Sequence, residues 1–242
     1  LKVLHRRLRR CADHVRFLAE GRAAAAAAHP NRVYVFEAVE IAGLPLLAME
    51  LVSGETLAAH VRRLGPLPHR TAVAQIQQVI DGLEAGYLAG VLHRDIKPGN
   101  CFLDADGQVK VGDFGLASIA ARRRDEAAPA DAALFVGGTP EFAAPEQLTG
   151  DRTDIRSDIY AVGATLFFLL TGRPPFSHPD ITQLVEQVTT QPISWPEHPQ
   201  VPAGLRAVVN RCLAKNPAER FVDYAELRSA LHPFSPDAEE PA

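Results

Sequence analysis

Three polar residues that lie close together in the sequence have the side-chain types that catalysis uses. The stretch HRDIKPGN (93–100) contains Asp95, Lys97 and Asn100, between an expected helix and an expected hairpin. A loop held between regular elements is a common position for catalytic residues. Asp95 and Lys97 are two positions apart, so in an extended chain both side chains fall on the same side and reach one substrate. Asn100 adds a neutral oxygen that can bind a metal ion.

A second acidic residue completes a candidate magnesium site. Asp113 lies in the expected hairpin 101–115, in which Asp106-Gly107 is a typical turn signal. Because the hairpin returns the chain, we expect the Asp113 carboxylate opposite Asn100, and oxygen ligands of this kind suit Mg²⁺. A carboxylate base, a lysine and a magnesium site are the parts that phosphoryl transfer needs, because that reaction depends on positioning and charge neutralisation.

Strands and one helix are expected in the first fifty residues. LKVL (1–4) is typical of a strand end, and residues 12–28 contain a run of six alanines with high helix propensity. His29-Pro30-Asn31 ends that helix. RVYVFEAVEI (32–41) and LPLLAMELV (44–52) are rich in strand-forming residues and predict an antiparallel hairpin.

Helices dominate the rest of the chain. The apolar spacing predicts helices over residues 56–64, 69–90, 157–171, 180–190, 203–214 and 222–231. Residues 116–156 show little periodicity, and the acidic, Pro-containing end 235–242 is typical of a disordered tail. The sequence therefore predicts an α+β chain, in which a small strand-rich part joins a larger helical part near Val52–Gly54.

The composition is that of a globular protein. The chain has 242 residues, of which 47% are hydrophobic and 22% are charged. Its formal net charge of -4 argues against a nucleic-acid surface. Cys11, Cys101 and Cys212 lack the spacing of metal ligands, so a reducing, cytoplasmic setting is expected. The longest apolar run, around 161–170, is too short to span a bilayer.

Six stretches of the chain resemble the eukaryotic-like Ser/Thr protein kinases of bacteria. They are MELVSGETL (49–57), HRDIKPGN (93–100), DFG (113–115), GTPEFAAPE (138–146), SDIYAVGATLFFLLTGRPPF (157–176) and NPAERF (216–221). One three-letter motif would be weak, but six motifs in the kinase order make the resemblance specific. It implies the bilobal protein-kinase fold, with a partial small lobe at 1–52, a helical lobe at 53–232 and an acidic tail or linker at 233–242.

The resemblance also implies which residues carry out the reaction. Asp95 would be the base that accepts the proton of a Ser or Thr hydroxyl in a protein substrate. Lys97 would neutralise the transferred phosphoryl group, and Asn100 and Asp113 would hold Mg²⁺. Thr139 would face the substrate and form a hydrogen bond near Asp95.

A second set of residues would bind ATP. Lys2 resembles the strand lysine that contacts the α- and β-phosphates, and Glu20 is the acidic helix residue at the right place to pair with it. In isolation, both side chains would be expected in solvent. The residues expected around the adenine are Met49 guarding its pocket, Glu50 and Val52 through their backbone groups, and Phe102 beneath the ring.

Four further residues are implied to have structural roles. Glu146 and Arg220 resemble the buried ion pair that fixes the helical lobe, and Asp158 would brace the backbone of the catalytic loop. His93 would pack under Phe114 of the DFG motif.

The sequence departs from the family pattern in three places. No glycine-rich hairpin precedes Lys2, so we expect a truncated chain that holds nucleotide poorly. No Ser, Thr or Tyr lies between Ser118 and Thr139, so we expect Arg94 to pair with a carboxylate, Asp131 first, and activity without loop phosphorylation. Ser118 remains a minor alternative switch, and Gly99 in place of a glutamate argues against a preference for basic substrates.

Two other classes of function remain open. A non-catalytic pseudokinase scaffold would have no need to retain Lys2, Asp95, Asn100 and Asp113 together. A small-molecule kinase would have no need of the peptide-binding platform that GTPEFAAPE resembles. The expected partners are protein substrates, and dimerisation through the small lobe stays open. The expected setting is cytoplasmic, with the cytoplasmic part of a membrane-anchored receptor kinase as an alternative.

Overall fold

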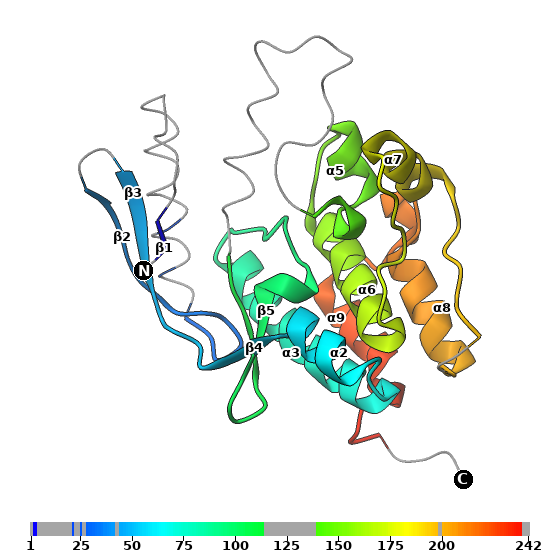
Figure 1. Ribbon diagram of the computed structural model, residues 1–242, viewed down its shortest axis with the longest axis horizontal. Coiled ribbons are helices and arrows are strands. Elements are labelled where there is room, and N and C mark those ends of the chain that lie inside the picture. Colours follow the sequence, from blue (N-terminus) through cyan, green and yellow to red (C-terminus); the bar gives the residue numbers. More distant parts are fainter. Residues whose placement is uncertain are drawn as a thin grey trace.

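The chain folds into a small N-terminal strand region and a larger C-terminal helical part (Figure 1), which confirms the predicted α+β class. The computed structural model describes residues 2–3, 21, 25, 28–41, 44–113, 139–197 and 200–238. Within these ranges, one cluster of buried apolar residues extends from Leu57 to Leu231. The main core therefore belongs to the helical part, which is the part that carries the HRDIKPGN loop.

The strand region is an antiparallel sheet with the order β1-β3-β2. Strand β1 comprises Lys2–Val3, β2 comprises Val35–Ile41 and β3 comprises Leu44–Met49. The predicted hairpin of β2 and β3 is confirmed. Of the helix predicted over 12–28, the structure describes Gly21, Ala25 and residue 28, and the first two are helical; Glu20 lies outside the described residues.

Gly21 lies directly against this sheet. A Cβ atom at Gly21 would be 2.6 Å from the Ala38 Cβ and 2.9 Å from the Leu47 Cδ2. Leu47 is also the strand partner of Lys2. A larger side chain at position 21 would push the backbone away from the sheet.

A second small sheet lies at the edge of the helical part and has the order β4-β5-β6. Its strands are β4 (Gly54–Thr56), β5 (Cys101–Asp104) and β6 (Val109–Val111). The predicted β5–β6 hairpin is confirmed. Strand β4 was not predicted, because three residues are too few for an alternating pattern to be recognised.

Helix α6 (Ile155–Thr171) runs through the middle of the helical part, where it packs against α3 and α8 (Figure 1). It begins at Asp154, whose carboxylate accepts the Arg156 N–H, and it ends at Gly172 in the left-handed conformation. The other helices are α2 (Leu57–Leu64), α3 (His69–Leu88), α5 (Pro145–Thr149), α7 (Ile181–Thr190), α8 (Ala203–Cys212) and α9 (Tyr224–Leu231). Short 3₁₀ turns occur at η1 (Pro98–Asn100), η4 (Pro140–Phe142), η5 (Pro217–Glu219) and η6 (His232–Phe234). No described helix is both long and apolar enough to cross a membrane.

A polar junction fastens the segment before β2 to the helical part. The Asn31 amide donates to the Val109 carbonyl at 2.9 Å and to the Gln78 Oε1 at 3.1 Å. The same Gln78 oxygen accepts the Val109 N–H at 2.8 Å. The Asn31 carbonyl accepts the Val111 N–H at 2.9 Å and lies so close to Gly82 of α3 that a Cβ atom there would overlap it.

The start of the acidic C-terminal segment is packed, unlike the tail expected at 233–242. Ser235 is buried, and Arg70 Nη1 donates to the carbonyls of Ser235 at 2.9 Å and Ala238 at 3.4 Å. The Phe234 ring lies against Gly204 of α8. An aromatic anchor and an arginine therefore hold residues up to 238, a contact that composition alone does not indicate.

Candidate active site

The HRDIKPGN loop connects α3 to β5, and Asp158 of α6 holds its first two peptide groups. The buried Asp158 carboxylate accepts the His93 N–H at 2.9 Å and the Arg94 N–H at 2.8 Å. This confirms the predicted brace of the catalytic loop. Arg94 has φ 64°, a left-handed conformation that is unfavourable for a residue with a side chain. The Asp158 hydrogen bonds help the loop to keep this conformation.

His93 connects the loop to the residue before Asp113. Its ring is 1% exposed, and Nε2 lies 2.7 Å from the Gly112 carbonyl. The Asp95 N–H donates to His93 Nδ1 at 3.3 Å. Since a carbonyl only accepts and an N–H only donates, the ring is neutral with its proton on Nε2. Burial lowers the pKa of His93, which agrees with a neutral ring. The predicted contact with Phe114 lies outside the described residues.

The structure brings Asp95, Lys97 and Asn100 together. Lys97 Nζ lies 3.1 Å and 2.9 Å from the two carboxylate oxygens of Asp95. The Asn100 amide nitrogen donates to the Asp95 carbonyl at 2.8 Å and to Asp95 Oδ2 at 3.0 Å. Two residues on the same short loop therefore orient the carboxylate.

Asn100 and Asp113 are a candidate pair of oxygen donors, of the kind that Mg²⁺ prefers. Because the Asn100 NH₂ group faces two oxygens of Asp95, its own Oδ1 is turned away from them, where it can face a cation. The Gly112 N–H donates to the Asn100 carbonyl at 2.9 Å, which brings the next residue, Asp113, close to Asn100. Mg²⁺ commonly takes one or two protein oxygens and completes its coordination with water and phosphate.

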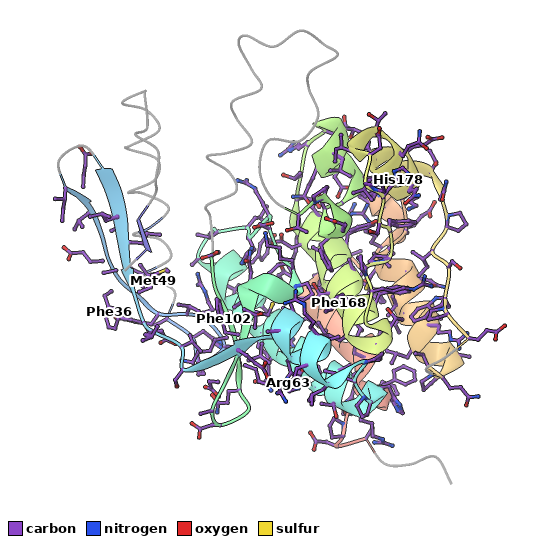
Figure 2. The ribbon with its side chains drawn as sticks, in the orientation of Figure 1. Phe36, Met49, Arg63, Phe102, Phe168 and His178 are labelled. Carbon is purple, nitrogen blue, oxygen red and sulfur yellow. The ribbon has the colours of Figure 1, made fainter. Side chains whose placement is uncertain are left out.

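The residues expected around the adenine lie where the strand region meets the helical part. Figure 2 shows Met49 and Phe102 in this position. The Glu50 N–H already donates to the Tyr34 carbonyl at 2.9 Å, so Glu50 can offer only its own carbonyl to an adenine. The Phe102 ring packs on Gly112, where a Cβ atom would be 2.8 Å from the ring.

For three expected site residues, Lys2, Glu20 and Thr139, the described part of the chain shows no side-chain contact with the HRDIKPGN loop. Only the backbone of Lys2 is described, and Glu20 lies outside the described residues. Thr139 precedes η4, and its carbonyl accepts the Phe142 N–H at 3.2 Å. Among the described residues, the hydrogen bonds to the Asp95 carboxylate come from Lys97 and Asn100, and the expected one from the Thr139 hydroxyl is not among them.

The predicted ion pair of Glu146 and Arg220 is confirmed. The Arg220 guanidinium donates to both Glu146 oxygens, at 2.7 Å and 2.9 Å, and its side chain is fully buried. Ser157 Oγ adds a third hydrogen bond to Glu146 at 2.7 Å. Burial alone would raise the pKa of Glu146, but Arg220 and Ser157 outweigh it and hold the pKa below its usual value.

Two residues at the site were missed by sequence reasoning. Lys110 of β6 pairs with Glu50 at 2.6 Å, and Gln147 of α5 donates to the Arg94 carbonyl at 2.8 Å. The position of Gln147, three residues after Ala144, suggests a side chain that reaches back over the helix start. Nothing in the sequence indicates its contact with the catalytic loop.

The two-part fold and the contents of this loop define a protein kinase. The chain belongs to the protein kinase domain family, which it matches over residues 1–232. It is 38% identical to the serine/threonine-protein kinase PknB of Mycobacterium leprae over 224 residues, which are 90% of this chain and 35% of that protein.

Two further relatives extend this result. The chain is 40% identical to the serine/threonine-protein kinase Pkn1 of Myxococcus xanthus over 238 residues, which are 96% of the chain and 34% of that protein. It is 35% identical to a probable serine/threonine-protein kinase of Corynebacterium efficiens over 234 residues, or 92% of the chain and 35% of that protein. The chain thus spans about a third of the length of these curated relatives.

Proposed function

We propose that the chain is the catalytic part of a kinase that transfers the γ-phosphoryl group of ATP to Ser or Thr hydroxyls of proteins. The observation that carries this proposal is the Asp95 carboxylate, which Lys97 and Asn100 hold in one orientation beside the Asn100–Asp113 oxygen pair. In this proposal residues 1–52 belong to the nucleotide-holding small lobe, and residues 53–232 form the lobe that receives the protein substrate.

Asp95 accepts the proton of the substrate hydroxyl as the hydroxyl oxygen attacks the γ-phosphorus. Lys97, which already contacts both Asp95 oxygens, lies within reach of the same substrate and neutralises charge on the transferred group. ATP with Mg²⁺ supplies the phosphoryl group and much of the charge neutralisation when it is bound. Asn100 and Asp113 hold the metal, and Thr139 contributes from the substrate side.

The nucleotide is held by the strand region and by the hairpin beneath it. Lys2 contacts the phosphates and is oriented by Glu20; the contact of Gly21 with Leu47, the strand partner of Lys2, supports this pairing. The adenine lies between the strand region and the β5–β6 hairpin. Its contacts are Met49, the Glu50 carbonyl, the Val52 backbone and the Phe102 ring.

The test is Asp95→Asn in the full-length natural protein. We expect a loss of at least about a hundredfold in kcat for phosphorylation of a protein substrate, since the amide cannot accept the proton. Asp106→Asn is the matched control, because Asp106 lies exposed in the β5–β6 turn, where Asn-Gly is equally suitable.

Two results would overturn the proposal. One is an Asp95→Asn variant as active as the control. The other is a wild-type protein that binds nucleotide without transferring phosphate, which would favour a pseudokinase scaffold. Thermal unfolding of both variants verifies that any loss of activity is not a loss of fold.

A further inference from the structure

Gln147 links the start of α5 to the catalytic loop through both ends of its side-chain amide. Nε2 donates to the Arg94 carbonyl at 2.8 Å, and Oε1 accepts the Ala144 N–H at 3.0 Å. A carbonyl only accepts and an N–H only donates, so these two partners determine the orientation of the amide. Arg94 is the residue before Asp95, and Ala144 lies in the GTPEFAAPE segment.

The peptide groups on both sides of Arg94 are held by side chains from other helices. The Arg94 N–H donates to Asp158 at 2.8 Å, and the Arg94 carbonyl accepts from Gln147. Arg94 needs such support because its φ of 64° is unfavourable for a residue with a Cβ atom. Asp158 fixes one side of this residue, and Gln147 fixes the side that leads to Asp95.

Gln147 also closes a ring of contacts among three segments. Its neighbour Glu146 accepts a hydrogen bond from Ser157 Oγ at 2.7 Å. Ser157 precedes Asp158, which holds the Arg94 N–H. The ring therefore runs from the catalytic loop to the start of α5, on to the start of α6, and back to the loop. Without Gln147 the loop would keep its link to α6 and lose this direct link to α5.

We propose that Gln147 is a positioning residue for the phosphoryl transfer. It holds the peptide between Arg94 and Asp95, and thereby aligns the Asp95 carboxylate with the GTPEFAAPE segment. The catalytic consequence rests on the proposed function, whereas the structural bridge does not. Among the described residues, the hydrogen bonds of the Gln147 side chain go to Arg94 and Ala144 and not to Asp95 or Glu50, so we expect its loss to lower kcat and leave the KM for ATP unchanged.

Two substitutions separate this role from a role in stabilising α5. Gln147→Glu keeps an oxygen for the Ala144 N–H, and a glutamate at this position suits the start of a helix. The same substitution removes the Nε2 donor and places a carboxylate oxygen against the Arg94 carbonyl. Gln147→Met has a similar length and removes both hydrogen bonds. The matched control is Gln183→Glu, because Gln183 is exposed on α7 and far from the loop in the sequence.

The first experiment measures hydrogen exchange in the 242-residue chain and needs no activity. In Gln147→Glu and Gln147→Met, we expect the Asp95 amide, which shares its peptide group with the Arg94 carbonyl, to exchange about tenfold faster, the effect of losing one hydrogen bond to that peptide group. Gln183→Glu should leave this rate unchanged. Equal Asp95 exchange rates in the wild type and both Gln147 variants would overturn the bridge.

The second experiment measures kinetics in the full-length natural protein. We expect kcat to fall about tenfold in both Gln147 variants, with the KM for ATP within about twofold of the wild type. Loss of kcat in Gln147→Met alone would mean that only the helix start matters, and would overturn the positioning role. An active wild type whose Gln147 variants retain kcat would overturn it too. A wild type without transfer would instead contradict the proposed function, while the exchange result still decides whether the bridge exists.

Discussion

The Lys110 ammonium lies 2.6 Å from the Glu50 carboxylate and joins the end of the strand region to the hairpin that leads to Asp113. The two side chains are only 22% and 23% exposed, so solvent screens this pair less than it screens a surface pair. Glu50 directly follows Met49, the last residue of β3, and Lys110 is the middle residue of β6. The ion pair therefore fixes the segment whose backbone is proposed to contact the adenine.

Lys110→Met should raise the KM for ATP about fivefold, with kcat within about twofold of the wild type. Without the ion pair to its carboxylate, Glu50 is held less firmly, and so is its backbone carbonyl, which is proposed to contact the adenine. Glu50→Gln retains a neutral acceptor and should have a smaller effect. Steady-state kinetics of the full-length protein provides the measurement, with the exposed Glu219→Gln as the control. A lower kcat with an unchanged KM would contradict this role.

Arg220→Met should lower the free energy of unfolding by about 3–5 kcal/mol, because it leaves the Glu146 carboxylate buried without its partner. Chemical denaturation at about pH 7 measures the change. The control is Arg63→Met on α2, which removes an exposed ion pair with Glu55 and should change stability far less, because solvent screens that pair. Similar effects for the two variants would show that burial of the Glu146 pair has no special importance.

The contribution of Glu146 should also depend on pH. Its pKa lies below the usual value of 4.5, so the Arg220 pair stabilises the fold above that pH, and the stabilisation is lost as the pH falls through the lowered pKa. In Arg220→Met, burial raises the pKa of Glu146 and the hydrogen bond from Ser157 opposes it without help from Arg220, so the carboxyl is expected to take up a proton at a higher pH than in the wild type. The stability difference between wild type and variant should therefore narrow from about pH 7 to about pH 4. If the stability difference between wild type and variant stayed constant over this pH range, the Glu146–Arg220 ion pair would not be the source of the difference.

Gly82→Ala should destabilise the chain by about 1–3 kcal/mol, because the added methyl group overlaps the Asn31 carbonyl at the junction with the helical part. Gly99→Ala is the matched control. A Cβ atom at Gly99 meets nothing within 4 Å, so its effect should stay within about 0.5 kcal/mol. Thermal or chemical unfolding distinguishes the two, and equal effects would mean that the close approach at Gly82 can relax without penalty.

Arg94 should function without a phosphate on the loop that follows DFG. Its Nε is buried and has no hydrogen-bond partner among the described residues, which leaves a site for an anionic partner. We expect Asp131→Asn to lower kcat several-fold and Ser118→Ala to have no effect, because a carboxylate mimics part of a phosphate's charge. Mass spectrometry of active full-length protein that reveals an obligatory phosphate in this loop would refute the prediction.

Local patterns in the sequence were enough to predict the elements that carry the site. The apolar spacing predicted α3 and α6, and the Asp106-Gly107 turn predicted the β5–β6 hairpin, because both signals act over a few residues. The spacing of Asp95, Lys97 and Asn100 predicted a shared site, since one short loop carries all three. The family resemblance predicted the Glu146–Arg220 pair and the Asp158 brace, which periodicity alone would not indicate.

Contacts between distant segments could not be predicted in the same way. Gln147 reaches a carbonyl 53 positions away, and Lys110 reaches a carboxylate 60 positions away. Strand β4 has three residues, and its Gly54 lies so close to the Leu103 carbonyl that a side chain would overlap it. Each contact depends on a neighbour that is distant in the sequence and comes into range only in the folded chain.

The sequence by itself determined the longer helices and the two hairpins, the kinase family and the identity of the polar residues in the HRDIKPGN loop. The tertiary structure alone decided that Gln147 holds the Arg94 carbonyl and that Lys110 holds Glu50. The physical reason is the range of the forces involved. Backbone propensity and apolar periodicity act between near neighbours in the chain, whereas a hydrogen bond requires the right distance and direction between groups that only packing brings together.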